Sequence, residues 1–256
     1  MAPRRMLKAA ALLITLGYCS LLVYQGGVAF NFQENRVDGS VQVSDLSIGP
    51  VGTTILNDST HKNITLDDIF ISVKTTQYYQ HTRLPIILKT WFQLAKRQTW
   101  FFTDINNPQH QRQTNGHMVN TNCSASHQRK HLCCKTSVEY DYFLESGKKW
   151  FCHFDDDNYV NVPRLFFVLQ QYNHQLDWYL GRTSVNKPIS VSFDRKTIKK
   201  MTFSFWFATG GAGFCISRSL ALKMLPVASG GKFISVCEGI RFPDDVTMGF
   251  IIASRL

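Results

Sequence analysis

The sequence predicts an α/β fold, in which a mostly parallel sheet carries helices on both faces, behind an N-terminal membrane anchor. Three observations predict it. Short apolar segments alternate with segments of helical periodicity over residues 67–256, and this alternation is typical of a parallel sheet. The chain of 256 residues, 44% hydrophobic and 18% charged, is long enough for one large domain. An unbroken apolar run follows a basic N-terminus.

The N-terminal segment has the composition of a signal anchor. The apolar run from Ala9 to Tyr24 is shorter than the ~20 residues that span an average bilayer, but it can extend to residue 30. A cleaved signal peptide is the alternative, although no small-x-small cleavage site follows the run. Basic residues near such a run stay in the cytosol. We therefore expect a cytosolic tail at 1–8, a transmembrane helix at 9–30 and a lumenal body. The basic residues are Arg4, Arg5 and Lys8.

Two further features agree with a lumenal body, held off the membrane by a polar stem at 31–66. Three N-x-S/T sequons, at Asn57, Asn63 and Asn122, are candidate glycosylation sites. Six cysteines follow the apolar run, and an oxidising lumen would let them pair. They do not have the spacing of a zinc site, and sequence alone leaves their connectivity open. These six are Cys123, Cys133, Cys134, Cys152, Cys215 and Cys237.

The first half of the body begins with a strand and a helix. Residues 69–76, "IFISVKTT", are short, apolar and β-branched, as in a buried strand. Apolar residues recur at helical spacing over 83–96. Further strands are predicted at 99–104 and 118–123, and a helix at 135–147 that ends on a glycine.

The second half centres on a strand, "KWFCHF", that runs directly into three aspartates. A helix behind the aspartates follows Pro163, since the missing N–H of proline costs little at a helix start. Further strands and helices complete the alternation. The expected strands are 149–154, 177–182 and parts of 203–217, and the expected helices are 164–172, 218–225 and 244–256.

The aspartates Asp155, Asp156 and Asp157 carry the clearest chemical signal. Ligands of an open α/β sheet bind at the carboxyl ends of its strands. Carboxylates placed there suit Mg²⁺ or Mn²⁺, which share their coordination shell with substrate phosphates. A solvated turn or a helix cap is the alternative for an arbitrary run of aspartates. The aromatic strand before them and the helix after them favour the metal site.

The charge and the missing motifs narrow the substrate class. The net charge of +10 suits an anionic nucleotide diphosphate. The basic residues are scattered rather than gathered into a stripe with stacking aromatics, so we expect no nucleic-acid partner. The phosphate-binding motifs of NTPases and dinucleotide enzymes are absent from the sequence. Together with the anchor and stem, these features predict a Golgi glycosyltransferase that uses a nucleotide sugar.

Longer strings resemble the Fringe family, and within it the radical fringe group. "FISVKTT", "NCSASH", "WFCHFDDDNYVN", "FWFATGGAGFCISRSLALKM" and "PDDVTMGFI" have the order and spacing of that family over about residues 67–252. The resemblance implies a GT-A-type fold in the Golgi lumen. It implies an inverting transfer of GlcNAc from UDP-GlcNAc, in β-1,3 linkage, to O-linked fucose on EGF repeats of Notch receptors, which modulates Notch signalling.

The resemblance also implies roles for individual residues. Asp157 corresponds to the Mn²⁺ ligand, Asp156 to a residue contacting the UDP-sugar, and Arg83 to a donor-binding arginine. Asp245 corresponds to the catalytic base, with Asp244 as its cap or support. Without the family, a solvated residue in the first turn of a helix is the preferred interpretation of Arg83. For Asp244 and Asp245, a cap of the final helix is as good an interpretation as a catalytic role.

The family pattern further implies the disulfides Cys123–Cys134 and Cys152–Cys215, which leaves Cys133 and Cys237 over. The second bond would tie the strand before the aspartates to the strand after "TGGAGF", residues 209–214. Those glycines either bring the backbone close to a ligand or form a plain tight turn.

The end of the chain departs from the family. Fringe enzymes continue past the position of Leu256 and supply a histidine to the manganese site, and none of the eight histidines here stands in a matching context. On this resemblance, weak or absent transferase activity is the alternative to GlcNAc transfer. We also expect an exposed apolar patch formed by Met248, Phe250, Ile251 and Ile252. The alternatives are therefore an inactive fringe-like lumenal binding protein and a related β-1,3-galactosyltransferase.

Overall fold

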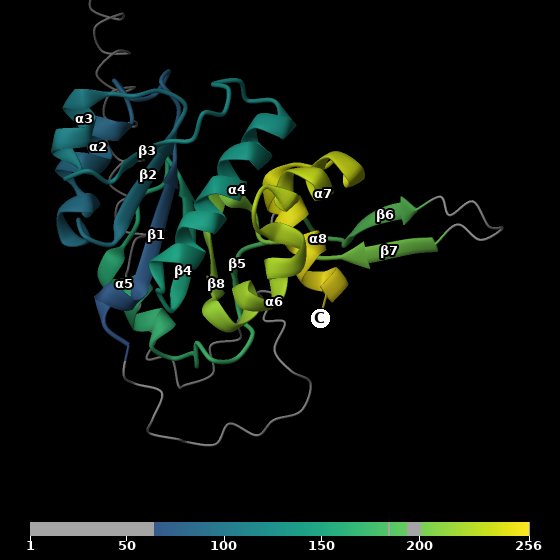
Figure 1. Cartoon of the computed structure of the whole chain (residues 1–256). Helices are drawn as coiled ribbons and strands as arrows, with labels where there is room; N and C mark the ends of the chain where they lie inside the picture. The colour runs from purple at the N-terminus through teal and green to yellow at the C-terminus, as the bar shows by residue number, and fades with distance from the viewer. Residues whose placement is uncertain (1–63, 184, 194–200, 256) are drawn as a thin grey trace, which may run out of the picture. The chain divides into compact units, whose positions relative to one another are not determined.

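The computed structural model describes residues 64–183, 185–193 and 201–255 (Figure 1). All of them belong to one compact unit within Ser44–Leu256. The expected cytosolic tail and membrane helix, nearly all of the stem, and two of the three sequons, Asn57 and Asn63, lie outside the described residues.

A six-stranded sheet of order β3-β2-β1-β4-β8-β5 forms the centre of the described unit. The four strands from β3 to β4 are parallel, as predicted. Strand β8 runs antiparallel to both β4 and β5, so one side of the sheet is mixed. The strands are β1 (Ile69–Lys74), β2 (Thr99–Thr103), β3 (Met118–Asn120), β4 (Trp150–Asp155), β5 (Tyr179–Gly181) and β8 (Phe214–Ser217).

Helices cover both faces of this sheet and enclose two apolar cores (Figure 1). Helices α4, α6, α7 and α8 pack on one face, and α2, the 3-10 helix η3 and α5 pack on the other. The helices are α2 (Leu84–Lys89), α3 (Pro108–Gln113), α4 (Arg129–Ser146), α5 (Val162–Leu169), α6 (Arg218–Ala228), α7 (Lys232–Ile240) and α8 (Asp244–Arg255), with the 3-10 helices η2 (Leu66–Asp68), η3 (Trp91–Leu94) and η4 (Gly210–Ala212).

Alternation along β1 determines which side chains face α4. Successive side chains of a strand point to opposite faces. Ile69, Ile71 and Val73 belong to the core beneath α2, whereas Phe70 belongs to the core beneath α4. By the same alternation Lys74, the last residue of the strand, lies on the α4 side.

The helix expected at 83–96 is two elements, α2 and η3. The backbone leaves helical geometry at Thr90, with φ −115° and ψ −113°. The hydroxyl of Thr90 donates to the carbonyl of Ile86 at 2.7 Å, so it competes with the helical hydrogen bonds of this turn. The apolar periodicity continues across the break because both pieces bury the same face.

Several elements were not expected from the sequence. Helix α3 is a short polar helix whose N-cap is Asn107, and α7 lies between the two predicted C-terminal helices. Strand β6 (Ile189–Phe193) was also not expected. It pairs in a separate antiparallel hairpin with β7 (Met201–Phe205), which overlaps the strand region expected at 203–217. Helix α4 begins at Arg129, earlier than the expected residue 135.

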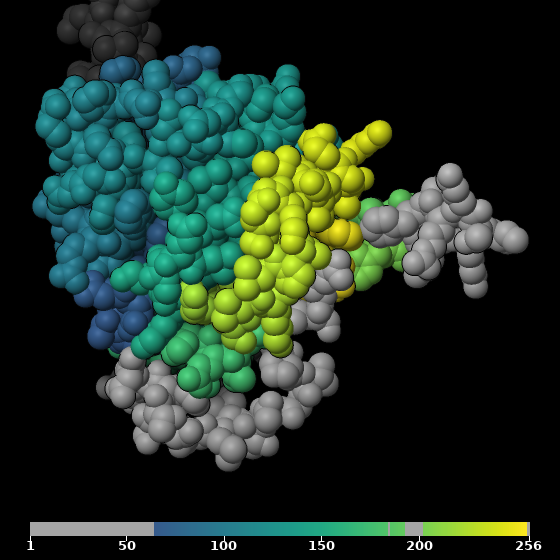
Figure 2. Space-filling model, in the orientation of Figure 1, coloured from purple at the N-terminus to yellow at the C-terminus, as the bar shows by residue number. Residues whose placement is uncertain are grey.

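The expected apolar patch on the final helix is wrong. Met248, Ile251 and Ile252 are at most 1% exposed and belong to the core formed with α4, α6 and α7. Phe250 packs edge-on against the rings of Phe203 and Phe205 of β7. In Figure 2 the yellow C-terminal helices lie directly against the teal surface of the body. The final helix therefore buries its apolar face.

Among the described residues, no single helix is long and apolar enough to cross a membrane. Helices α6 and α7 meet the length and composition criteria only as a pair, which is bent by 75°.

Candidate active site

A cavity of about 800 Å³ opens where β1 and β4 end. Its volume lies in the range of ~300–1,000 Å³ typical of small-molecule sites. Eight charged side chains line its walls, with aromatic rings and glycine backbone between them. The lining residues are Lys74, Thr75, Thr76, Tyr78, Tyr79, Arg83, Ala125, Ser126, His127, Leu132, Lys135, Asp155, Asp156, Asp157, Gly210, Gly211, Pro243, Asp244 and Asp245.

Sheet topology brings these distant segments together. Lys74 and Asp155 are register partners at the parallel ends of β1 and β4. Because β8 is antiparallel to β4, it begins at the edge where β4 ends, so the glycine turn before it lies at the same edge. Gly213 has a φ of +77°, and a Cβ there would lie 2.4 Å from the ring of Phe154. The turn therefore requires glycine at Gly213, while Gly210 and Gly211 line the cavity.

The three consecutive aspartates have three different environments. Asp155 lies 3.4 Å from the ammonium of Lys74. Burial alone would raise the pKa of Asp155, but the charge of Lys74 and the neighbouring His153 hold it well below its usual range. Asp156 is buried, and Asp157 is 54% exposed at the cavity. The like charges are therefore compensated by two cations, Lys74 beside Asp155 and Arg83 beside the other two aspartates.

Arg83 joins two of these aspartates to α2. Its Nη1 lies 2.6 Å from Oδ1 of Asp156 and 3.3 Å from Oδ2 of Asp157, and its guanidinium stacks over the ring of Tyr79. The hydroxyl of Thr75 also donates to Asp156, at 2.8 Å. Burial nevertheless leaves the pKa of Asp156 above its ordinary value. The structure thus groups three predicted site residues, and Asp157 is the one most open to a ligand.

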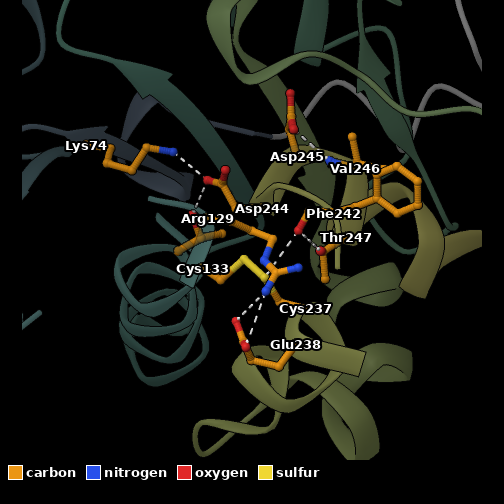
Figure 3. The surroundings of a disulfide bond; sticks show 11 residues. Lys74, Arg129, Cys133, Cys237, Glu238, Phe242, Asp244, Asp245, Val246 and Thr247 are labelled. Atoms are coloured by element: carbon orange, nitrogen blue, oxygen red, sulfur yellow. Dashed lines mark hydrogen bonds and ion pairs between the residues drawn. A yellow bond between two sulfur atoms is a disulfide. The ribbon is translucent and has the colours of Figure 1, made fainter. Parts of the chain in front are cut away.

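Asp244 and Asp245, adjacent at the start of α8, have divergent side chains (Figure 3). Asp244 is buried, and its Oδ2 accepts hydrogen bonds from Lys74 at 2.5 Å and Thr136 at 2.7 Å. Burial alone would raise the pKa of Asp244, but the charge of Lys74 lowers it. Asp244 therefore supports the site through side-chain contacts, and within the described residues its side chain accepts from Lys74 and Thr136 rather than from the N–H groups of the helix.

Asp245 faces the cavity. Its Oδ2 accepts the N–H of Gly210 at 3.1 Å, and its Oδ1 accepts the N–H of Val246 at 2.8 Å. Burial and the neighbouring charge of Asp244 raise the pKa of Asp245 above its usual value. A cavity carboxylate with a raised pKa is suited to accept a proton from a substrate.

A buried network below the cavity was missed by sequence reasoning. His153 Nδ1 lies 2.6 Å from Oε2 of Glu139 on α4, which also accepts the hydroxyl of Ser72. Burial would lower the pKa of His153, but the charge of Glu139 raises it to about 9. Burial would likewise lower the pKa of Lys74, but Asp244 and Asp155 raise it. The signal in the sequence was that polar residues occupy alternate positions at the ends of the apolar strands β1 and β4.

All six cysteines of the described unit form disulfides. Both implied bonds are present, Cys123–Cys134 and Cys152–Cys215. The second joins directly opposed residues of β4 and β8. The two cysteines left over in the sequence also pair, as Cys133–Cys237, which links α4 to α7.

The charges of the cavity fit a divalent cation bound with phosphates. Five aspartates line it against three basic side chains, Lys74, Arg83 and Lys135, so the cavity is acidic although the chain is basic. The described residues contain no group of three or more His, Cys, Asp or Glu side chains placed to hold a metal. Divalent ions at phosphate sites typically use one or two carboxylates and complete their shell with substrate oxygens and water. Asp157 fits that requirement.

Comparison with known proteins gave consistent relatives. The family model described as Fringe-like matches residues 64–256. The Fringe glycosyltransferase of Drosophila melanogaster is 65% identical over 75% of this chain and 47% of its own length. Lunatic fringe of Danio rerio is 52% identical over 76% of this chain and 52% of its own length. Radical fringe of Gallus gallus is 51% identical over 82% of this chain and 55% of its own length. Both are named β-1,3-N-acetylglucosaminyltransferases, and the chain spans about half the length of these curated relatives.

Proposed function

The chain belongs to the Fringe-like family, and on that premise we propose that it is a glycosyltransferase of GT-A fold that transfers GlcNAc from UDP-GlcNAc. The acceptor is O-linked fucose on EGF repeats of Notch receptors, joined in β-1,3 linkage. The observation that carries the proposal is the convergence of Arg83, Asp157 and Asp245 on one cavity from three separate parts of the chain.

Asp245 is the proposed base of the reaction. An inverting transfer requires a carboxylate to take the proton from the acceptor hydroxyl while its oxygen attacks the anomeric carbon. The N–H groups of Gly210 and Val246 orient this carboxylate, and its raised pKa strengthens it as a proton acceptor. Asp244, the neighbouring residue, stays ionised because the positive charge of Lys74 pairs with its carboxylate and lowers its pKa.

Asp157 and Arg83 form the proposed donor side of the cavity. Asp157 would hold Mn²⁺, which when bound neutralises charge on the departing diphosphate. Asp156 would contact the UDP-sugar, with Arg83 beside it as a donor of charge-assisted hydrogen bonds. Because Arg83 bridges two carboxylates, its guanidinium is already oriented before a donor binds.

A donor screen tests the proposed activity. The chain, supplied with Mn²⁺ and an O-fucosylated EGF repeat, is expected to transfer GlcNAc from UDP-GlcNAc and to use UDP-galactose poorly. Product formation is measured by mass spectrometry of the repeat. Preference for UDP-galactose would instead assign a galactosyltransferase, and UDP binding without transfer would indicate a binding protein.

We place this domain in the Golgi lumen, behind a type II anchor. The proposal is supported by the basic and apolar N-terminus, and by six paired cysteines, which require an oxidising compartment. Asn122 is exposed, as a glycosylated asparagine must be. We expect expression in animal cells to give endoglycosidase-sensitive glycan at Asn122. A cytosolic, unglycosylated product would refute this placement.

A further inference from the structure

We propose that the disulfide between Cys133 and Cys237 positions the proposed base by fixing the start of α8 against α4. The inference rests on the proposed function, because it gives the bond a purpose in that reaction. Both cysteines are fully buried, and the bond joins residues 104 apart in the sequence. The other two disulfides lie elsewhere, one within the sheet and one between α4 and the loop before it.

One face of α4 contacts the end of α7 and the start of α8, which together we call the α7–α8 corner. Arg129, Cys133 and Thr136 follow one another at spacings of four and three, which places them on the same side of a helix. Nη2 of Arg129 lies 3.2 and 3.3 Å from the carboxylate oxygens of Glu238 on α7. The hydroxyl of Thr136 donates to Asp244 on α8. Helix α4 thus holds this corner at three points, of which the disulfide alone is covalent. Figure 3 shows two of them, the disulfide and the pair of Arg129 with Glu238.

The segment between the disulfide and α8 is short and closely bonded. The N–H of Arg241 donates to the carbonyl of Cys237 at 2.9 Å, which ends α7. The disulfide sulfur of Cys237 is in contact with the carbonyl oxygen of Phe242 at 3.3 Å, and that carbonyl accepts a hydrogen bond from the hydroxyl of Thr247 at 3.4 Å. A shift of Cys237 therefore reaches the first turn of α8 through Phe242.

The direction of Asp245 depends on the backbone of that first turn. Both aspartates line the cavity, but the carboxylate of Asp244 is bonded to Thr136 on α4, whereas that of Asp245 is bonded to Gly210, so the turn sets both directions. The partly exposed pair of Arg129 and Glu238 is weak by itself. A misplacement of about 1 Å can cost roughly 10²-fold in rate. A covalent bond at this corner prevents such a shift.

The test compares two double variants of the full chain. Cys133→Ala with Cys237→Ala removes the bond, and Cys123→Ala with Cys134→Ala removes the adjacent bond of α4 as a matched control. Hydrogen exchange read by mass spectrometry is expected to rise at residues 238–250 in the first variant, with β1 and β4 unchanged, and to stay unchanged at 238–250 in the control. The turnover number of the first variant should fall about 10-fold or more with the donor KM retained, as expected for a displaced base.

Unchanged exchange at 238–250 in the first variant would overturn the proposal. An equal rise across β1 and β4 would do so too, because the bond would then be a general stabiliser. If the unaltered chain transfers no sugar, the proposed function fails, whereas the exchange comparison still decides whether the bond orders α8.

A second variant covers the case in which the first does not fold. Thr136→Val removes the hydroxyl that bonds Asp244 with almost no change in shape, and Thr136→Ser keeps it. The valine variant should raise exchange at the start of α8 and lower turnover, and the serine variant should restore both. Equal exchange in the two variants would overturn the role of this face of α4.

Discussion

Asp245→Asn is expected to fold and bind UDP but to lose about 10²–10⁴-fold in turnover, the range that a general base contributes. The amide oxygen of asparagine can still accept the N–H of Gly210, so the local structure has a reason to persist. The amide cannot accept the substrate proton. The measurement is steady-state transfer to an O-fucosylated EGF repeat, beside UDP binding by calorimetry.

The pH profile gives the same variant a second readout. Burial and the charge of Asp244 raise the pKa of Asp245. A base works when deprotonated, so turnover should be full above this raised pKa and should fall as the pH drops through it. The acid limb should therefore lie above pH ~3.9, the ordinary value for aspartate, and should be missing from the residual activity of the variant.

Asp141→Asn is the matched control. Asp141 also accepts a backbone N–H, from Gly230 at 3.0 Å, and burial also raises its pKa, but it lies outside the cavity. We expect normal turnover in this control. Near-normal turnover in Asp245→Asn would remove Asp245 from its proposed role.

Asp157→Ala is expected to weaken Mn²⁺-dependent binding of UDP by at least ~10–100-fold, the cost typical of disturbing even an indirect metal contact. Since the side chain is 54% exposed, the fold should tolerate its removal. Arg83 keeps its closer carboxylate, Asp156, at 2.6 Å. Calorimetric titration of UDP with and without Mn²⁺ separates the metal-dependent part of the affinity, and turnover should fall with it.

Glu145→Ala removes an exposed carboxylate of α4 that does not line the cavity, and it serves as the control for lost charge. Its Mn²⁺-dependent UDP affinity should equal that of the unaltered chain. An unchanged affinity in Asp157→Ala as well would show that the metal is held without Asp157.

The described segments of the chain differ in how well the sequence predicted them. Strands β1, β2 and β4 were predicted nearly to their ends, because a buried strand is a short apolar segment with clear limits. Strand β6, its pairing with β7 and helix α7 were missed. Their apolar residues pack against elements distant in the sequence, and their own patterns are too short to indicate a period.

The candidate site was predicted in part. The aspartates at the end of β4 stood out because a run of like charges directly follows an apolar strand. Lys74, Glu139 and His153 gave no such signal, since each is an isolated polar residue whose partners lie on other elements. The pairing of Cys133 with Cys237 also depends on how α4 and α7 pack, which spacing in the sequence does not encode.

The sequence by itself determined the α/β class, the mostly parallel character of the sheet and the edge of the sheet where carboxylates gather, because these follow from local periodicity and chain direction. The tertiary structure alone decided which carboxylate is paired, buried or open to the cavity. Asp156 is held by Arg83, Asp244 by Lys74 and Thr136, and Asp157 is exposed, although all belong to runs of identical neighbours. The state of a charge depends on the groups within a few ångströms of it, and in this site those groups come from β1, α2 and α4.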